Sequence, residues 1–442
     1  MSSVEMPPPP AAEPRPPRMK EGPDLLVVSV RQFVGHRLAR QMGLAVGLMA
    51  ATKLITVFAG AWAVRCLGPG GMSISAMIFI TSTQLSLFNG VALDALVIRR
   101  YKVLPTAEER HEYAVMVMNH RLFLSLCLSL AGLGLFVCLG LGHEWLLGTM
   151  AAVPYLIFNS IQPTWVIAAE EQSHLRYVIT SVQSLIIAAL YVAFFRAGQR
   201  AGSDVVVTAI ATVAAYFFAT FVALKWKNPL PIRLKSLTTL WPMLKEGRWL
   251  ILTAVLLYAQ GLMDLPLVGY LRPKDVGVYQ VAYKIVGPVQ EICVLLQLVL
   301  YPRFVEWQKL GSRFMWQRQL RLALVFVAGL LPAGLLAFVV VPPVMRALYG
   351  VEFEASAYPT VLLLIGRGIW VISLWFSLGL WAGTHDRRAF LVLLPVAAIM
   401  LTLTLLLVPR YGMIAAASVN LFGQCLVCLG FFAAARHKGR AG

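Results

Sequence analysis

The sequence predicts an all-α integral membrane protein, with about 12 transmembrane helices in two parallel-repeat six-helix lobes around a central cavity. Hydrophobic residues make up 59% of the 442 residues and charged residues only 13%, and the mean hydropathy is +0.74. Most of such a chain cannot face water. The apolar residues fall into regularly spaced runs, and Lys and Arg gather in alternate connections between them, which are the other two observations that predict this fold class.

The apolar runs have the length of about 20 residues that a helix needs to cross the hydrocarbon core. We expect the spans at approximately 42–64, 72–98, 116–141, 148–169, 176–196, 205–224, 249–271, 278–301, 321–345, 357–380, 389–409 and 412–434.

The distribution of Lys and Arg predicts the orientation of these spans. Basic residues are frequent in the connections around 99–121, 225–248, 303–321 and 387–388 and in the C-terminal end "ARHKGRAG". The opposite connections are short and carry only Arg65, Arg196, Arg200, Arg272, Lys274, Arg346 and Arg410. Because cytoplasmic loops retain positive charge, both termini are expected in the cytoplasm. The formal net charge of +18 then needs no nucleic-acid partner.

The chain divides into six expected parts. Residues 1–23 form a proline-rich disordered cytoplasmic tail and residues 24–41 an interfacial helix. Two six-helix lobes at 42–224 and 249–434 follow, joined by a cytoplasmic linker at 225–248, and residues 435–442 form a basic cytoplasmic tail. Segments 66–76 and 270–280 occupy the same place in each lobe and share a Leu and a Pro in register, which indicates a parallel repeat. The alternative is a coincidence of turn chemistry.

Four motifs resemble those of the polysaccharide transporters, the O-antigen-type oligosaccharide flippases of the multidrug/oligosaccharidyl-lipid/polysaccharide exporter superfamily. They are "RCLGPGGMSISAMIF", "LRPKDVGVYQVAYKIVGPVQ", "LYGVEFEASAY" and "LVPRYGMIAAASV". Their order along residues 40 to 435 carries the resemblance, although Ala415 and Ala416 depart from the family's usual Gly-Ala.

The resemblance implies a multi-pass protein of the bacterial inner membrane. Such a protein would move a polyprenyl-diphosphate-linked oligosaccharide from the cytoplasmic to the periplasmic leaflet by alternating access, for surface or exopolysaccharide biosynthesis. The implied partners are this lipid-linked substrate, membrane lipid, and the polysaccharide polymerase and glycosyltransferases of the same pathway.

Ionisable side chains inside the membrane are costly and usually face a cavity or a partner. The helix expected at 278–301 carries polar residues at three- and four-residue spacing, which places them on one stripe. The stripe contains Gln280, Tyr283, Lys284, Gln290, Glu291 and Gln297. It predicts a wet cavity between the lobes, and a buried polar seam is the alternative.

Further charges at membrane depth are candidates for substrate binding or ion coupling. Lys53, Lys284 and Arg367 could meet the diphosphate, and Gly366 and Gly368 would leave room around Arg367. Lys53 could instead only neutralise Glu291. Asp264 is expected at the depth of Lys284 and could pair with it, either as a structural salt bridge or as a coupling site. Asp264 and Glu291 are the ion-coupling candidates.

The sequence offers no catalytic residues and no metal site, and every external connection is short, so we expect a transporter rather than an enzyme. It lacks a G-x-x-x-x-G-K-[ST] loop, so any energy must come from an ion gradient or from consumption of the product. No cofactor is expected, and a proton or sodium gradient could drive transport. One alternative is an ion-coupled multidrug antiporter of the same superfamily. A membrane-embedded polysaccharide polymerase is a weaker alternative, because it would need a sizeable external loop.

Overall fold

The computed structural model describes residues 37–88, 94–138, 143–170, 172–224, 248–382 and 386–441, with residues 241, 242 and 245 besides. The chain separates into two units, residues 1–44 and residues 45–442. The predicted tail at 1–23, most of the predicted interfacial helix and nearly all of the 225–248 linker lie outside the described residues. The account below concerns the second unit.

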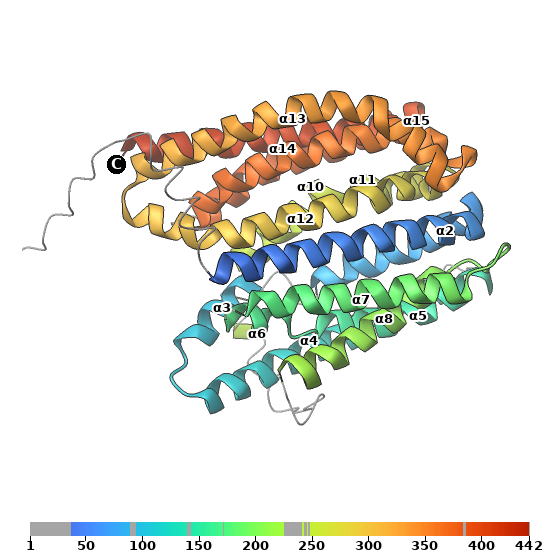
Figure 1. Cartoon of the computed structure of the whole chain (residues 1–442), viewed down its shortest axis with the longest axis horizontal. Helices are drawn as coiled ribbons and strands as arrows, with labels where there is room; N and C mark the ends of the chain where they lie inside the picture. The colour runs from blue at the N-terminus through green and yellow to red at the C-terminus, as the bar shows by residue number, and fades with distance from the viewer. Residues whose placement is uncertain are drawn as a thin grey trace, which may run out of the picture. The chain divides into compact units, whose positions relative to one another are not determined.

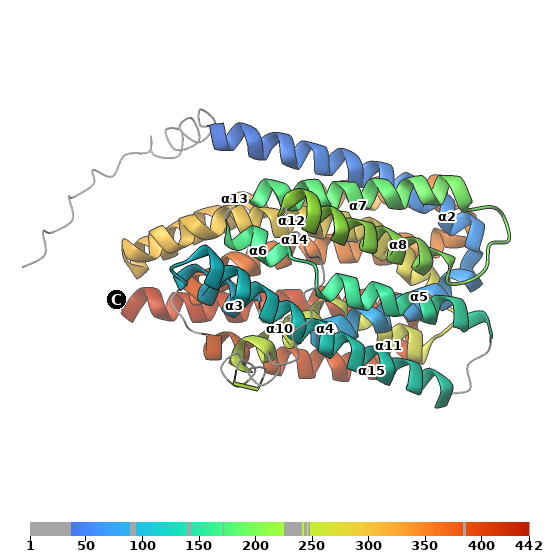
Figure 2. The same ribbon diagram turned by 90° about the horizontal axis from the view of Figure 1, so that it is seen from below.

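Residues 45–224, called here the N-terminal bundle, are helical throughout most of their length. α2 (Arg37–Phe88) leads into a short α3 (Asp94–Val103) and a long α4 (Ala107–Cys138). α5 (His143–Ser160) and α6 (Thr164–Ala169) follow, then α7 (Ser173–Phe194) and α8 (Ser203–Phe217), which continues as the π-helical turn η2 (Phe218–Ala223). α5 packs against both α8 and α4, and these helices run alongside one another (Figure 2).

Residues 248–441, called here the C-terminal bundle, begin with α10 (Arg248–Leu262) and α11 (Asp264–Leu271). α12 (Val276–Lys309), α13 (Ser312–Tyr349), the short 3₁₀ helix η4 (Val351–Ser356), α14 (Ala357–Ala382) and α15 (Asp386–Ala441) complete it. α14 packs against α12, α13 and α15. α12 lies beside α2 of the N-terminal bundle (Figure 1), so these two helices form the boundary between the bundles.

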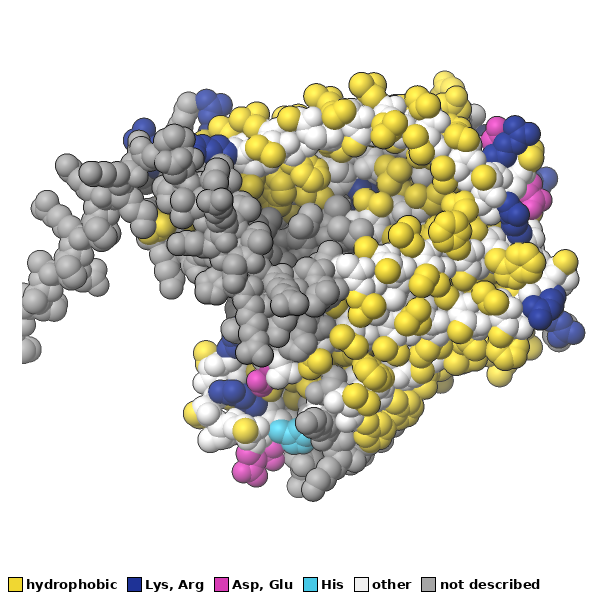
Figure 3. Space-filling model, viewed as in Figure 1, with side chains coloured by type: hydrophobic (Ala, Val, Ile, Leu, Met, Phe, Trp, Pro, Cys, Tyr) yellow, Lys and Arg dark blue, Asp and Glu magenta, His cyan; other side chains and the backbone are white. Residues whose placement is uncertain are grey.

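The helices confirm an all-α membrane protein. Among the described residues, seven helices are long and apolar enough to cross a membrane, or eight if α10 and α11, bent by 56° to each other, are one span. α13 exposes most of its apolar surface, including Leu324, Val325, Leu335 and Val339. Apolar side chains cover the middle of the face in Figure 3, and many of the visible charged ones lie toward its ends. This is the surface that lipid requires.

Each of two expected pairs of neighbouring helices meets at a single glycine. The spans predicted at 42–64 and 72–98 lie in α2, which contains two helical stretches separated by a kink at Gly68 (φ 65°, ψ 176°). The spans predicted at 389–409 and 412–434 are joined in α15, which turns at Gly412 (φ 64°, ψ −146°). A single glycine in a region of φ and ψ closed to other residues reverses the chain, so no loop is needed.

The two repeated segments meet each other at the end of the molecule that holds these turns, called here the turn end. The amide of Gly277 donates a hydrogen bond to Ser73 Oγ at 3.2 Å, and these residues occupy equivalent positions in the segments 66–76 and 270–280. Equivalent residues of a repeat touch only beside the axis that relates the two copies. The contact therefore agrees with a parallel repeat, and a Cβ at Gly277 would collide with Ser73 and with the Pro69 carbonyl.

Further hydrogen bonds close the turn end. The guanidinium of Arg65 donates from α2 to the carbonyl of Ala347 in α13, across the bundle boundary. Within each bundle the turns also bind neighbouring turns: the Gly202 amide donates to Ser75 Oγ at 2.9 Å, and Arg272 donates to the Pro409 carbonyl at 2.8 Å. The two bundles are thus held together at this end.

Gly68→Ala should destabilise the protein by about 1–3 kcal/mol, because alanine must adopt a backbone conformation that glycine alone tolerates. Thermal unfolding of the purified protein in detergent would measure the loss as a lower midpoint. Gly70→Ala is the matched control: Gly70 is helical, has open space around its Cβ position and has an ordinary φ. Equal midpoints for the two variants would contradict a special role for Gly68.

Candidate functional site

A cavity of about 470 Å³ lies between the two bundles. Its N-terminal-bundle lining comes from α2, α7 and α8, and its C-terminal-bundle lining from α10, α11, α12 and the end of α13. The size falls within the usual range for small-molecule sites. Four of its lining residues are charged, namely Lys53, Asp204, Lys284 and Glu291. The predicted central cavity is therefore present, and its charges balance.

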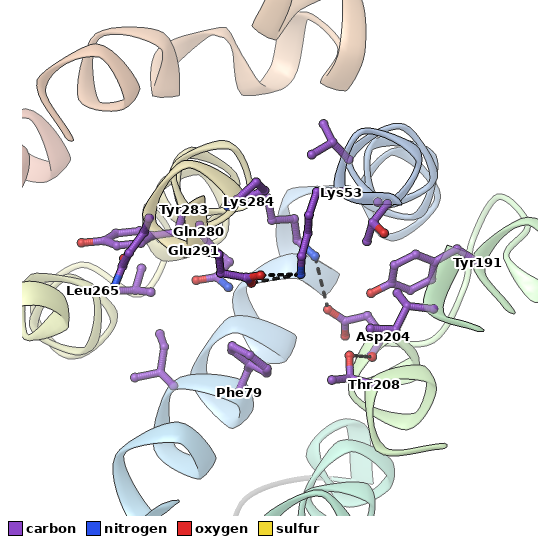
Figure 4. Close-up of a pocket in the computed structure, with 18 of the residues that line it drawn as sticks. Lys53, Phe79, Tyr191, Asp204, Thr208, Leu265, Gln280, Tyr283, Lys284 and Glu291 are labelled. Carbon is purple, nitrogen blue, oxygen red and sulfur yellow. Dashed lines mark hydrogen bonds and ion pairs between the residues drawn. The ribbon is translucent and has the colours of Figure 1, made fainter. Parts of the chain in front are cut away.

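Lys53 of α2 pairs with Glu291 of α12 across the bundle boundary. Its ammonium nitrogen lies 2.8 Å from Glu291 Oε2 and donates a hydrogen bond to Oε1 at 3.0 Å. The Lys53 side chain is 15% exposed and the Glu291 side chain 44%. The structure thus shows the neutralising contact considered for Lys53 (Figure 4), and the carboxylate is the more exposed member of the pair.

Lys284 of α12 makes the second pair, also across the boundary. Its ammonium nitrogen lies 3.9 Å from Oδ2 of Asp204, the second residue of α8. The other carboxylate oxygen of Asp204 is buried and has no hydrogen-bond partner among the described residues. The expected partner of Lys284 was Asp264, so the structure corrects the pairing: an acidic residue from the other bundle takes that place.

The polar stripe of α12 faces the cavity as its spacing predicts. Gln280, Tyr283 and Gln290 line it together with Lys284 and Glu291. The helix continues without interruption through Pro288. The side chain of Gln297, the last member of the predicted stripe, lies outside the described part of the chain.

Asp264 does not line the cavity. It begins α11 just after the break at Met263 and is 4% exposed. Its carboxylate accepts hydrogen bonds from Tyr279 Oη at 2.5 Å and from Tyr283 Oη at 2.6 and 2.7 Å. Asn420 Nδ2 donates to it at 3.2 Å, and the Leu265 amide at 3.0 Å. Four neighbouring groups thus hydrogen-bond to this carboxyl group, so it needs no ligand from the cavity to satisfy it.

Arg367 lies in the same buried network rather than in the cavity. It is 1% exposed, and it donates from Nη2 to the Gly261 carbonyl at 2.6 Å. This carbonyl lies just before the break between α10 and α11, and Asn420 Nδ2 also lies within 3.4 Å of it. The guanidinium is close enough to Asp264 to attract it electrostatically. The glycines beside Arg367 do not make room for a ligand, because Gly368 packs against Leu330.

The sequence reasoning missed several residues of the N-terminal bundle. Asp204, Tyr191, Thr208 and Phe79 all line the cavity (Figure 4). In the sequence, Asp204 follows Gly202 and Ser203 at the start of a helix. An acidic residue is favourable there because of the helix dipole, so its position gave no reason to expect a lysine from another helix.

No protein-family model and no curated protein matches the sequence, but solved structures do match the fold. They include a lipid flippase and multidrug transporters, so the chain has a fold that such membrane proteins share.

Two of these structures show the extent of the likeness. The lipid II flippase MurJ in its inward closed conformation has a TM-score of 0.70 and 13% sequence identity, with 89% of this chain and 87% of that chain covered. A multidrug resistance MATE family transporter of the MOP superfamily, in an inward-facing conformation, has a TM-score of 0.63 and 14% identity over 88% of this chain and 95% of that chain. At these identities the likeness concerns the fold.

Tyr279→Phe should destabilise the protein by about 1.5–3 kcal/mol, because it removes a charge-assisted hydrogen bond from a buried carboxylate. Thermal unfolding in detergent would measure this as a lower midpoint. Tyr177→Phe is the control, since the Tyr177 hydroxyl is also buried but has no partner among the described residues. If both variants unfold at the same temperature, the hydrogen bond to Asp264 contributes nothing to stability.

Proposed function

We propose that this protein is a flippase for a polyprenyl-diphosphate-linked oligosaccharide, moving it from the cytoplasmic to the periplasmic leaflet of a bacterial inner membrane. The observation that carries the proposal is the position of Lys53 and Lys284. The two ammonium groups come from opposite bundles and line one cavity, so an anionic head group could contact both bundles at once. The lipid tail would remain in the bilayer beside the apolar helices.

The solved structure of the lipid II flippase supports the same substrate class, because its fold covers most of this chain. The pathway would be the synthesis of a surface glycan or exopolysaccharide, such as O-antigen, with polymerase and glycosyltransferases as its further partners. In this proposal both termini are cytoplasmic, so the turn end lies at the periplasmic side. The basic connections predicted to be cytoplasmic support this orientation.

Transport driven by a proton gradient fits the cavity better than transport driven by sodium through Asp264. The Asp264 carboxylate already accepts hydrogen bonds from three side chains. Glu291 faces the cavity and is 44% exposed, so a proton could reach it. Protonation of Glu291 would release Lys53 for the substrate.

An ion-coupled multidrug antiporter is the second candidate, and one observation favours it. The cavity contains as many carboxylates as lysines, and Asp204 and Glu291 could bind a cationic drug. The MATE transporter matched above supports this alternative through its fold.

Lys53→Met together with Lys284→Met should reduce flipping of a polyprenyl-diphosphate-linked disaccharide by about a hundred- to ten-thousandfold. Each substitution would remove a charge-assisted hydrogen bond to the diphosphate worth about 1.5–3 kcal/mol. Proteoliposomes in which a lectin or glycosidase reports the sugar on the outer leaflet would measure the rate. Lys274→Met is the matched control, because Lys274 is exposed on the turn before α12.

The same vesicles separate the two candidates. Flipping that depends on the cavity lysines, without transport of tetraphenylphosphonium, supports the flippase. Tetraphenylphosphonium exchange for protons or sodium, lost in Glu291→Gln and unaffected by the lysine substitutions, would replace the flippase with the antiporter.

A further inference from the structure

The four cavity charges are arranged crosswise between the bundles (Figure 4). The N-terminal bundle provides Lys53 and Asp204, and the C-terminal bundle provides Glu291 and Lys284. Each ion pair therefore joins one bundle to the other. The bundles cannot move apart on either side of the cavity without breaking one of these two pairs.

The pairs lie at two depths. Lys284 and Glu291 are seven residues apart on α12, which is about 10 Å along a helix axis. Lys284 is nearer to the turn end, where Gly277 binds Ser73, and Glu291 is further from it. Opening of the bundles away from the turn end would break the Lys53–Glu291 pair, and opening at the turn end would break the Lys284–Asp204 pair.

Neither pair is fully buried. The Lys284–Asp204 distance of 3.9 Å is longer than a hydrogen bond, and one oxygen of Asp204 has no partner among the described residues. Glu291 is nearly half exposed and Lys284 is more exposed than Asp204. Exposure of one member lowers the cost of separating an ion pair, because water can solvate the released charge.

We propose that Asp204 and Glu291 occupy the two cavity lysines in competition with the substrate, so that a multiply charged head group binds by displacing both carboxylates and replaces the two direct ion pairs between the bundles with contacts through the head group. A diphosphate has more charge and more acceptor oxygens than a carboxylate, so it can displace one. A neutral lipid cannot. The inference rests on the proposed function and adds to it the two residues that determine substrate selection and the coupling of binding to bundle movement.

The competition predicts that removal of a negative charge from the cavity tightens binding of the substrate. Glu291→Gln and Asp204→Asn keep the side-chain size but free Lys53 and Lys284. Each should bind farnesyl diphosphate in detergent about three- to tenfold more tightly than the native chain, as expected when the substrate no longer has to break a weak ion pair. Glu352→Gln removes the same charge at an exposed site on η4, outside the cavity, and should leave the affinity unchanged.

A second measurement needs no ligand. In a protein whose native cysteines are replaced by alanine, Thr56→Cys places a thiol on the cavity wall. Its alkylation by a water-soluble maleimide should become several-fold faster when Glu291→Gln or Asp204→Asn is added, because the bundles separate more often. Tyr270→Cys, at an 81% exposed position, should react at the same rate in every background.

The outcomes distinguish the two proposals. Binding of farnesyl diphosphate with unchanged or weaker affinity in both carboxylate variants overturns the competition and leaves the flippase standing. No binding by the native chain overturns the flippase and the competition with it. Unchanged alkylation of Thr56→Cys in both variants overturns the role of the ion pairs in holding the bundles together, whatever the binding result.

Discussion

The pairing of charges inside an apolar bundle is the constraint on which the rest of this structure depends. An isolated charge at membrane depth costs several kcal/mol, so each of those described here has a partner or a set of donors. Lys53 and Lys284 find theirs on the opposite bundle, whereas Asp264 finds its donors within its own bundle. The same rule therefore produces a labile site between the bundles and a rigid one inside the C-terminal bundle.

The backbone supplies the geometry that brings these charges together. α2 and α15 each reverse at one glycine, so the turns are compact enough for the two repeated segments to touch at Ser73 and Gly277. That contact fixes the distance between α2 and α12 at the turn end. Further along the same two helices, Lys53 and Glu291 come within 2.8 Å. A side chain at Gly277 would collide with Ser73, so it would move the helices apart and weaken the pair.

The helices and the polar face of α12 could be predicted from the sequence, because local spacing determines them. The partners of buried charges could not, because they come from distant parts of the chain. The apolar runs predicted the spans, and the three- and four-residue spacing on α12 predicted that Gln280, Lys284 and Glu291 would line a cavity. The partner of Lys284 comes from a helix 80 positions earlier in the chain, so no local pattern could identify Asp204.

Arg367 shows why residue type alone misled the prediction. Glycines on both sides suggested space for a ligand, but small residues in membrane helices equally allow close packing, and here they bring α14 against α13 and α15. The buried guanidinium then binds the Gly261 carbonyl, which the break in the helix leaves available. Arg367 thus stabilises the bend that places Asp264 beside Tyr279.

The cavity is neutral overall, so its net charge does not determine which ligand it takes. What matters is which member of each pair can move. In one pair Glu291 is more exposed than Lys53, and in the other Lys284 is more exposed than Asp204. Movement of Glu291 frees Lys53, and movement of Lys284 away from Asp204 frees that lysine too, so both ammonium groups can bind phosphate. Asp204, one oxygen of which has no partner among the described residues, can then accept hydrogen bonds from sugar hydroxyls. A cationic drug would bind the carboxylates and leave both lysines without a partner.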